Sequence, residues 1–220
     1  MPEALLFDFD GLILDTEVPV YEAWRHNYEA HGYDLPLETY VQCVGSNFHR
    51  FDPKAHLDGL VDEEIDWSYW DTKREKTAYD LTLELAPFPG VVPLLEEARA
   101  RAVPCVVASS SPRSWVEDHL GRLGLLPFFT ATRCLDDVAA AKPAPDLFLA
   151  AAEIAGTNPA EALVLEDSRN GLIAAQRAGI DCIIVPNRIT QGLDFDGASA
   201  VLETLEGVTL SKLDEIRARD

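Results

Sequence analysis

Short apolar runs alternate with amphipathic segments along most of this chain. The apolar runs predict buried β-strands in the segments EALLFDF (3–9), VPCVVAS (103–109), ALVLED (162–167) and DCIIVP (181–186). Other segments have apolar residues at helical spacing: VVPLLEEARARA (91–102), SWVEDHLGRLGL (114–125), DLFLAAAEIAG (146–156) and NGLIAAQRAG (170–179). Apolar strands that alternate with helices are typical of a parallel sheet covered on both faces. The predicted fold class is therefore α/β, with a Rossmann-like parallel-sheet core.

A long helical segment interrupts this pattern after the first predicted strand. Aromatic, histidine and charged residues recur there at helical spacing, in YEAWRHNYEAHG (21–32) and IDWSYWDTKREKTAYDLTLEL (65–85). Pro87, Pro89 and Gly90 then break the helical pattern and mark the return to the core. We predict a core domain formed by residues 1–15 and 88–220, with an inserted α-helical cap domain at residues 16–87.

The composition is that of a globular protein with a strongly acidic balance. Hydrophobic residues make up 47% of the 220 residues and charged residues 25%, which is too apolar for a disordered chain. The formal net charge of -20 at pH 7 argues against nucleic acid and anionic membranes as partners, because both bind basic surfaces. We expect a monomer or a small homo-oligomer that binds a small molecule.

Cysteine usage and the lack of long apolar runs bear on location. The four cysteines are far apart in the sequence and form no CxxC pair. The first residues, MPEALLFDFDG, lack the basic and long apolar segments of a secretion signal, and no apolar run approaches the length of a membrane span. We therefore expect a reducing, cytoplasmic location.

Two carboxylates follow the first predicted strand. Residues two apart at a strand end face the same side, so Asp8 and Asp10 would project together while Phe9 points into the sheet. Gly11 permits a sharp turn after them. Carboxylates this close repel each other unless a cation or a proton offsets their charge. Alone, this DxDG motif fits a solvated strand end as well as a functional site.

A second acidic pair, Glu166 and Asp167, ends the predicted strand ALVLED. Helix capping explains one of these acids better than it explains both. Because ligands of parallel sheets bind at the carboxyl ends of the strands, this pair can join Asp8 and Asp10 in one site. Oxygen ligands without histidine or cysteine favour Mg²⁺ and argue against Zn²⁺, although Mn²⁺ or Co²⁺ would accept the same ligands.

Serine and lysine residues that could bind phosphate follow in the sequence. Ser109 and Ser110 lie in VVASSS, where hydroxyls and successive backbone N–H groups at a strand end can bind phosphate oxygens. Lys142 precedes Pro143 in AKPAPD, and a residue before proline is held out of the helical conformation. Each feature alone is common in surface turns, so it is the set of motifs that points to phosphate chemistry.

The motifs occur in a definite order: DxDG, a central serine, a lysine in a KP pair and a terminal acidic pair. In this order the chain resembles the haloacid dehalogenase superfamily of phosphotransferases over essentially its whole length. The segments AKPAPDLFLAAAE and LEDSRNGLIAAQRAGI resemble its β-phosphoglucomutase-like phosphatases, which carry a small helical cap. The resemblance implies a Mg²⁺-dependent phosphatase that hydrolyses a small phosphate ester, such as a sugar phosphate.

The resemblance also implies a role for each matching residue. Asp8 would attack phosphorus and form an aspartyl-phosphate. Asp10 would protonate the leaving alcohol and then deprotonate the water that hydrolyses the intermediate. Ser109 and Lys142 would hold the non-bridging phosphate oxygens. Further candidates for phosphate binding on the same loop are Ser110 and Arg113.

The implied metal site combines both acidic motifs. Mg²⁺ would bind Asp167, the Asp8 carboxylate and the main-chain carbonyl of Asp10, with Glu166 as a further ligand or in a supporting position. Bound metal and Lys142 would together offset the charge of a phosphate dianion that approaches Asp8.

Two features discriminate between branches of this superfamily. The dehalogenases lack an acid two residues after the first aspartate, so Asp10 favours phosphate ester chemistry. The mutases have a histidine early in the cap, where Val20 stands in this chain, so transfer to water is favoured and a phosphomutase is the alternative. Cap residues that could contact the leaving group are Glu17, Asn47, His49, Arg50, Lys54, Trp70 and Lys73.

Two non-enzymatic interpretations also account for some of these residues. A receiver-like phospho-switch module places acids, a hydroxyl and a lysine around Mg²⁺ on a similar sheet, but it has no inserted cap. A family member that had lost activity could serve as an interaction module, yet all four motifs are intact here. Turnover of a phosphate ester with Mg²⁺ separates the enzyme from both alternatives.

Overall fold

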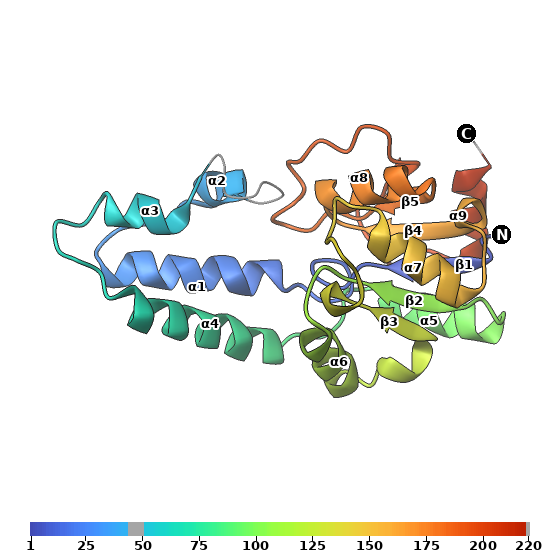
Figure 1. The fold of residues 1–220 in the computed structure, drawn as a ribbon, viewed down its shortest axis with the longest axis horizontal. Helices are drawn as coiled ribbons and strands as arrows, with labels where there is room; N and C mark the ends of the chain where they lie inside the picture. The colour runs from blue at the N-terminus through green and yellow to red at the C-terminus, as the bar shows by residue number, and fades with distance from the viewer. Residues whose placement is uncertain (44–50, 219–220) are drawn as a thin grey trace. The chain divides into compact units, whose positions relative to one another are not determined.

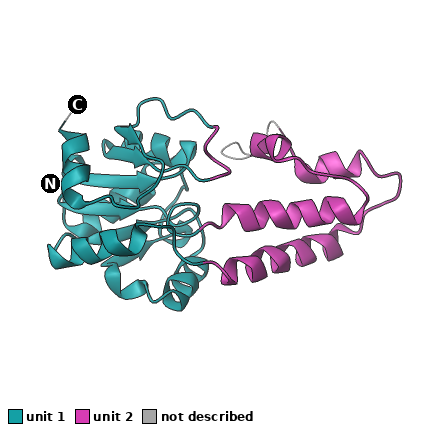
Figure 2. Ribbon diagram, turned by 180° about the vertical axis from the view of Figure 1, so that it is seen from behind, with its two compact units in different colours: residues 1–14, 86–187, 193–220 teal, residues 15–85, 188–192 magenta. Residues whose placement is uncertain are grey.

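The computed structural model describes residues 1–43 and 51–218. These residues belong to two compact units, shown in different colours in Figure 2. Unit 1 consists of Met1–Leu14, Ala86–Asn187 and Leu193–Asp220, and unit 2 of Asp15–Leu85 and Arg188–Gly192. Each unit has a hydrophobic core of its own.

Unit 1 is built on a parallel sheet (Figure 1). Among the described residues the sheet has six strands in the order β3-β2-β1-β4-β5-β6. Their bounds are β1 Ala4–Phe7, β2 Cys105–Ala108, β3 Ala131–Arg133, β4 Ala162–Glu166, β5 Asp181–Ile184 and β6 Ala200–Val201. Every neighbouring pair is parallel, which confirms the predicted Rossmann-like α/β class. The strand order changes direction between β1 and β4, the place where ligands bind in such sheets.

Helices cover both faces of the sheet. They are α5 Val91–Ala100, α6 Arg113–Arg122, α7 Asp146–Ala155, α8 Arg169–Ala178 and α9 Leu210–Arg217. Three short 3-10 helices lie in the connecting segments: η2 Leu126–Phe128, η3 Leu135–Asp137 and η4 Pro159–Glu161. In Figure 1, α7 and α8 lie in front of the sheet, and Figure 2 shows α5 and α9 on the opposite face. Strands β1, β2 and β4 are buried at every position, so both of their faces need this cover.

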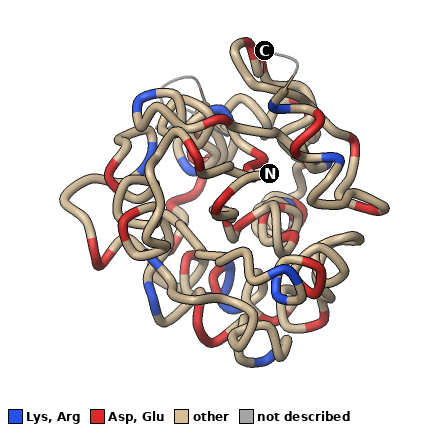
Figure 3. The backbone as a smooth tube through the Cα atoms, turned by 90° about the vertical axis from the view of Figure 1, so that its right-hand side faces the viewer, with Lys and Arg blue, Asp and Glu red and all other residues tan. Residues whose placement is uncertain are grey.

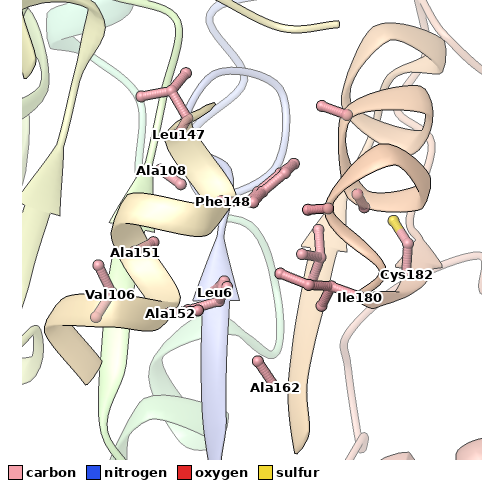
Figure 4. Close-up of a cluster of buried hydrophobic side chains, with 14 of the residues drawn as sticks. Leu6, Val106, Ala108, Leu147, Phe148, Ala151, Ala152, Ala162, Ile180 and Cys182 are labelled. Carbon is pink, nitrogen blue, oxygen red and sulfur yellow. The ribbon is translucent and has the colours of Figure 1, made fainter. Parts of the chain in front are cut away.

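Alternate strand residues meet α7 and α8 in one apolar cluster (Figure 4). Leu6 and Val106 from the strands belong to it together with Phe148 of α7 and Leu172 of α8, and all four are fully buried. Burying one such side chain contributes roughly 1.5–3 kcal/mol. The cluster therefore fixes α7 and α8 on the sheet, and with them the segments that lead into their first turns.

Unit 2 is helical in its described part. It contains α1 Glu17–Ala30, α2 Leu37–Tyr40, the 3-10 helix η1 Val41–Cys43, α3 Pro53–Asp58 and α4 Trp67–Leu83. Helices α1 and α4 lie side by side (Figure 1). An aromatic-rich core includes Tyr21, Trp24 and Tyr28 of α1. The Tyr28 hydroxyl donates to the Pro53 carbonyl oxygen at 2.8 Å, so its buried polar tip is satisfied and α1 is tied to α3.

Acidic residues are spread along the chain rather than gathered in one segment (Figure 3). Among the described residues, no helix is long and apolar enough to cross a membrane. Because the formal net charge is -20, an anion can be held only where local cations and hydrogen-bond donors outweigh this background.

Candidate active site

The end of β1 presents Asp8 at the carboxyl edge of the sheet. Its backbone N–H donates to the Leu165 carbonyl oxygen at 3.0 Å, which continues the pairing with β4 one residue past the strand. Asp8 is 6% exposed, and Phe9 is fully buried. Gly11 then adopts a φ of +80°, and its N–H donates to the Leu14 carbonyl oxygen at 2.8 Å. The chain therefore makes the sharp turn that the DxDG motif predicts.

Three carboxylates and one lysine meet at this edge of the sheet. Carboxylate oxygens of Asp8, Glu166 and Asp167 lie within 4.8 Å of one another. Lys142 Nζ lies 2.5 Å from Asp8 Oδ1 and 2.8 Å from Glu166 Oε1, and its side chain is 5% exposed. Lys142 is joined to Pro143 by a cis peptide bond. The ammonium group thus lies between the ends of β1 and β4, at the switch point of the sheet.

Burial and neighbouring charges shift the pKa values of this cluster. Burial raises the pKa of Asp8 well above its usual value, Glu166 and Asp10 raise it further, and Lys142 opposes the rise. Burial alone would lower the pKa of Lys142, but Asp8 and Glu166 outweigh that effect and raise it. Lys142 is therefore an ammonium ion. The cluster thus contains three carboxyl groups and one ammonium group, so a further cation at this site would offset negative charge that Lys142 leaves uncompensated.

Glu166 is engaged by donors on both carboxylate oxygens. Oε1 accepts from Lys142, and Oε2 accepts from the backbone N–H groups of Asp167 and Ser168, each at 2.8 Å. The Ser168 hydroxyl adds a third donor to Oε2 at 2.9 Å. A Cβ built on Gly171, in the first turn of α8, would come within 1.8 Å of this carboxylate. The geometry therefore suits Glu166 to hold Lys142 and the start of α8.

Asp167 is oriented by Asn187, a residue that the sequence analysis did not select. Asn187 Nδ2 donates to Asp167 Oδ2 at 2.7 Å and to the Gly11 carbonyl oxygen at 3.1 Å. The amide group therefore links the turn after β1, the end of β4 and the segment after β5. Its one sequence signal is its place just past the predicted strand DCIIVP, where ligand-binding residues of parallel sheets occur.

Asp10 contacts the loop and helix that follow β2. Its Oδ2 accepts from the Ser109 hydroxyl at 3.1 Å and from the Ser111 hydroxyl at 2.7 Å. Its Oδ1 accepts from the indole N–H of Trp115 at 2.9 Å. Ser111 and Trp115 were not selected from the sequence. The third serine of VVASSS carries no distinguishing mark, and a tryptophan on an amphipathic helix usually packs into a core.

The two remaining candidates on this loop lie in different surroundings. Ser110 is exposed, and its hydroxyl accepts from the backbone N–H of Lys142 at 3.2 Å. The Arg113 guanidinium binds acidic side chains, at 2.8 Å from Glu117 and 2.5 Å from Asp137. The structure thus joins Ser110 to the Lys142 segment and pairs Arg113 with carboxylates outside the buried cluster. Phosphate binding by Arg113 stays a prediction.

The candidate cap residues lie in unit 2. Glu17 is the first residue of α1. Lys54 Nζ forms an ion pair with Asp71 at 2.8 Å, and Lys73 Nζ lies 4.5 Å from the centroid of the Trp70 ring. Their contact with a leaving group stays a prediction. Three further candidates lie outside the described residues: Asn47, His49 and Arg50.

The buried donors fit a hard divalent cation. Asp8 and Asp167 offer carboxylate oxygens at the ends of two adjacent strands, and the metal-ligand cluster found among the described residues contains no histidine or cysteine. Oxygen-only ligands suit Mg²⁺, and a divalent charge would offset the repulsion among the carboxylates. The site can therefore hold a divalent metal ion.

The fold and the site together define the class of protein. The switch point of this Rossmann-like sheet carries buried carboxylates, an ammonium group and serine hydroxyls. This combination is typical of an enzyme that acts on phosphate groups. In agreement, the model of the haloacid dehalogenase-like hydrolases matches residues 5–185. This chain belongs to that family, in its β-phosphoglucomutase-like branch, and it is a phosphatase-type enzyme.

Individual relatives cover nearly the whole chain. YhcW of Bacillus subtilis (strain 168) is 40% identical over 214 residues, which span 97% of this chain and 96% of YhcW. The fructose-1-phosphate phosphatase YqaB of Escherichia coli (strain K12) is 32% identical over 182 residues, or 82% of this chain and 95% of YqaB. A crystal structure of CbbY from Rhodobacter sphaeroides, a mutant in complex with xylulose-(1,5)bisphosphate, has a TM-score of 0.75 and 27% identity, and covers 97% of this chain and 99% of CbbY.

Proposed function

We propose that this enzyme is a Mg²⁺-dependent phosphatase that hydrolyses small sugar phosphates through an aspartyl-phosphate on Asp8. The observation that carries the proposal is the buried Lys142 ammonium group, held between Asp8 and Glu166, whose carboxylates cluster with that of Asp167. A bare carboxylate repels a phosphate dianion, so attack requires positive charge next to the nucleophile. Lys142 supplies that charge in a fixed, desolvated position.

Asp8 is the proposed nucleophile. Its Oδ1 accepts a hydrogen bond from Lys142, and this contact orients the carboxylate at the edge of the sheet. In the proposed first step a carboxylate oxygen forms a bond to phosphorus while the bond from phosphorus to the leaving alcohol breaks. Lys142 and the Ser109 hydroxyl would hold the non-bridging oxygens as negative charge shifts onto them. The product of this step is an acyl phosphate on Asp8.

Asp10 is the proposed general acid and base. In the first step it gives a proton to the departing alcohol, and in the second it takes one from the water that attacks the aspartyl-phosphate. Its carboxylate is held by the Ser109 and Ser111 hydroxyls and by the Trp115 indole, so its position is defined before substrate binds. Hydrolysis then releases inorganic phosphate and restores Asp8.

Asp8, Asp167 and the main-chain carbonyl of Asp10 are the groups that would hold Mg²⁺. When bound, the ion supplies positive charge that offsets the phosphate dianion. Asn187 would keep Asp167 in the orientation that metal binding needs, because partners behind a ligand fix its geometry. Glu166 would act through Lys142, since donors already engage both of its oxygens.

Two relatives support a sugar phosphate as the substrate. YqaB is named for fructose 1-phosphate, and the solved CbbY mutant holds xylulose-(1,5)bisphosphate. Both are small phosphate esters, the substrate class that the family resemblance implies. We extend that class, without choosing a particular sugar, to this enzyme.

Phosphate release from a panel of sugar phosphates tests the proposal. We expect release that needs Mg²⁺, stops with a chelator and returns when the ion is restored. Asp8→Asn should lower kcat by at least about 10³-fold, since it removes the nucleophile. The matched control is Asp62→Asn, an exposed aspartate in unit 2, which should leave kcat unchanged. Full activity of Asp8→Asn, or turnover in the chelator, would contradict the mechanism, and an isomerised sugar phosphate as product would indicate a mutase.

A further inference from the structure

The indole of Trp115 makes a hydrogen bond to Asp10 that differs in kind from those of Ser109 and Ser111. Oδ2 of Asp10 accepts from two serine hydroxyls, whereas Oδ1 accepts from the indole N–H at 2.9 Å. A hydroxyl can rotate and become an acceptor, so it suits both a charged and a protonated carboxyl group. An indole nitrogen can only donate. The two oxygens of Asp10 are therefore not equivalent.

Packing within unit 1 holds the indole in this orientation. Trp115 lies in the first turn of α6, and His119 follows one turn later on the same face. The two rings meet edge to face with centroids 4.3 Å apart. The His119 ring is stacked at 6.3 Å on Phe9, the residue between the two aspartates of the DxDG motif. The indole is thus packed against His119 and, through it, against Phe9, and both of these rings are buried beside Asp10.

We propose that Trp115 is a positioning residue for proton transfer, which keeps Oδ1 of Asp10 as an acceptor and makes Oδ2 the oxygen that carries the transferred proton. The inference rests on the proposed function of Asp10 as general acid. With Oδ1 held by an obligate donor, a proton on that oxygen would weaken the indole hydrogen bond. On Oδ2 the same proton is accommodated, because Ser109 and Ser111 can turn and accept it.

The proton balance follows directly. In the first step the O–H bond at Oδ2 breaks and an O–H bond forms on the leaving alcohol, whose oxygen receives the electron pair of the broken P–O bond. In the second step water gives a proton to Oδ2 as its oxygen bonds to phosphorus. The electron pair of the Asp8–phosphorus bond then returns to the Asp8 carboxylate, and both aspartates are ready for another cycle.

Comparing two kinds of leaving group tests this role. The leaving group of a sugar phosphate is an alkoxide, which is a poor leaving group unless Asp10 protonates it. The leaving group of 4-nitrophenyl phosphate is a stabilised phenolate, which needs little protonation. Trp115→Phe keeps an aromatic ring against His119 and removes the N–H. We expect kcat/KM for the sugar phosphate to fall by about 10- to 100-fold, the range for misplaced general acids. For the aryl ester it should change by less than about 3-fold, because little proton transfer is lost.

A matched control repeats the chemical change elsewhere. Trp67 Nε1 donates to Asp58 at 2.8 Å in unit 2, so Trp67→Phe removes an indole–carboxylate hydrogen bond of nearly the same length as the one between Trp115 and Asp10. This variant should leave the ratio of the two kcat/KM values unchanged. Equal losses with both esters in Trp115→Phe, or no loss with either, would overturn the proposal. Wild-type protein that hydrolyses neither ester would instead contradict the proposed function.

A second measurement does not depend on turnover or on the folding of Trp115→Phe. The indole ¹H–¹⁵N resonance of Trp115 is assigned by elimination, with phenylalanine variants of the other tryptophans, Trp24, Trp67 and Trp70. Asp10→Ala removes the acceptor, so the Trp115 indole proton should move upfield while the other three indole resonances stay in place. An unmoved Trp115 resonance would overturn the proposed contact.

Discussion

The Lys142 side chain is almost entirely removed from water and lies between Asp8 and Glu166. A buried ion pair contributes little net stability, because both ions lose their hydration, but removing one partner leaves the other charges uncompensated. Here one cation serves two carboxylates at once. The contacts that orient the proposed nucleophile, Asp8, are therefore also contacts on which the fold depends.

We predict that Lys142→Met destabilises the chelator-treated protein by about 3 kcal/mol at neutral pH, the range for breaking a buried ion pair. The pKa of Asp8 is already raised by burial and would rise further without Lys142, so protonation relieves the variant in acid. The loss should therefore grow between pH 5 and pH 8. Urea unfolding measures it, with the exposed Lys212→Met as control. An equal loss at both pH values would contradict this explanation.

The sequence pointed to the charged groups of the site and to Ser109 and Ser110, but it did not point to Ser111, Trp115 or Asn187. Asp8, Lys142 and Asp167 stand in motifs whose order is recognisable, and the structure places their side chains at one edge of the sheet. Asn187 and Trp115 occur singly, without a motif or a spacing that marks them. A neutral side chain acquires its role from its neighbours in space, and the sequence alone does not show them.

At the scale of elements, the approach of α8 to β4 is set by a glycine. Gly171 lies in the first turn of α8, and a methyl group there would overlap the Glu166 carboxylate. This contact allows the start of the helix to lie directly against the strand end. Two donors to Glu166, the backbone N–H groups of Asp167 and Ser168, come from the segment that leads into this turn, so the position of the helix and the position of the carboxylate depend on each other.

We predict that Gly171→Ala lowers the free energy of unfolding by about 1–3 kcal/mol, as overpacking does, and reduces kcat because Glu166 must move. Gly121→Ala is the matched control, since it lies in α6 with no atom near its added methyl group. There alanine should be neutral or stabilising by up to about 1 kcal/mol. Thermal unfolding and phosphate release measure both variants. Equal stability of the two alanine variants would refute the close approach.

Elements were predictable where the pattern was long and apolar. The central strands and helices α7 and α8 match the predicted segments closely, because burial on both sides imposes a continuous apolar run. The edge strands β3 and β6 were not predicted. β3 has only three residues and β6 two, and a partly exposed short strand imposes no strong pattern on the sequence.

At the scale of the whole molecule, the net charge of -20 opposes the approach of a phosphate dianion. Added salt shortens the screening length from about 30 Å at 0.01 M to about 8 Å at 0.15 M. At saturating Mg²⁺ we predict that kcat/KM rises severalfold over this range while kcat stays constant. Initial rates in KCl measure the effect. A steady fall of kcat/KM with salt would mean that attractive charge dominates the approach.

The strand order has a consequence for the chain while it is being made. β1 pairs with β2 on one side and with β4 on the other, and β4 ends at Glu166. On the ribosome, β1 is made long before β4, so one apolar edge of β1 stays unpaired until β4 has been made, and an unpaired edge is the kind of surface that aggregates or recruits chaperones. Helices α1 and α4 are closer to each other in sequence than β1 is to β4, so this helix pair can assemble earlier. Asp8, the residue proposed as nucleophile, is thus made long before Glu166 and Asp167, the acidic residues that lie beside it in the folded protein.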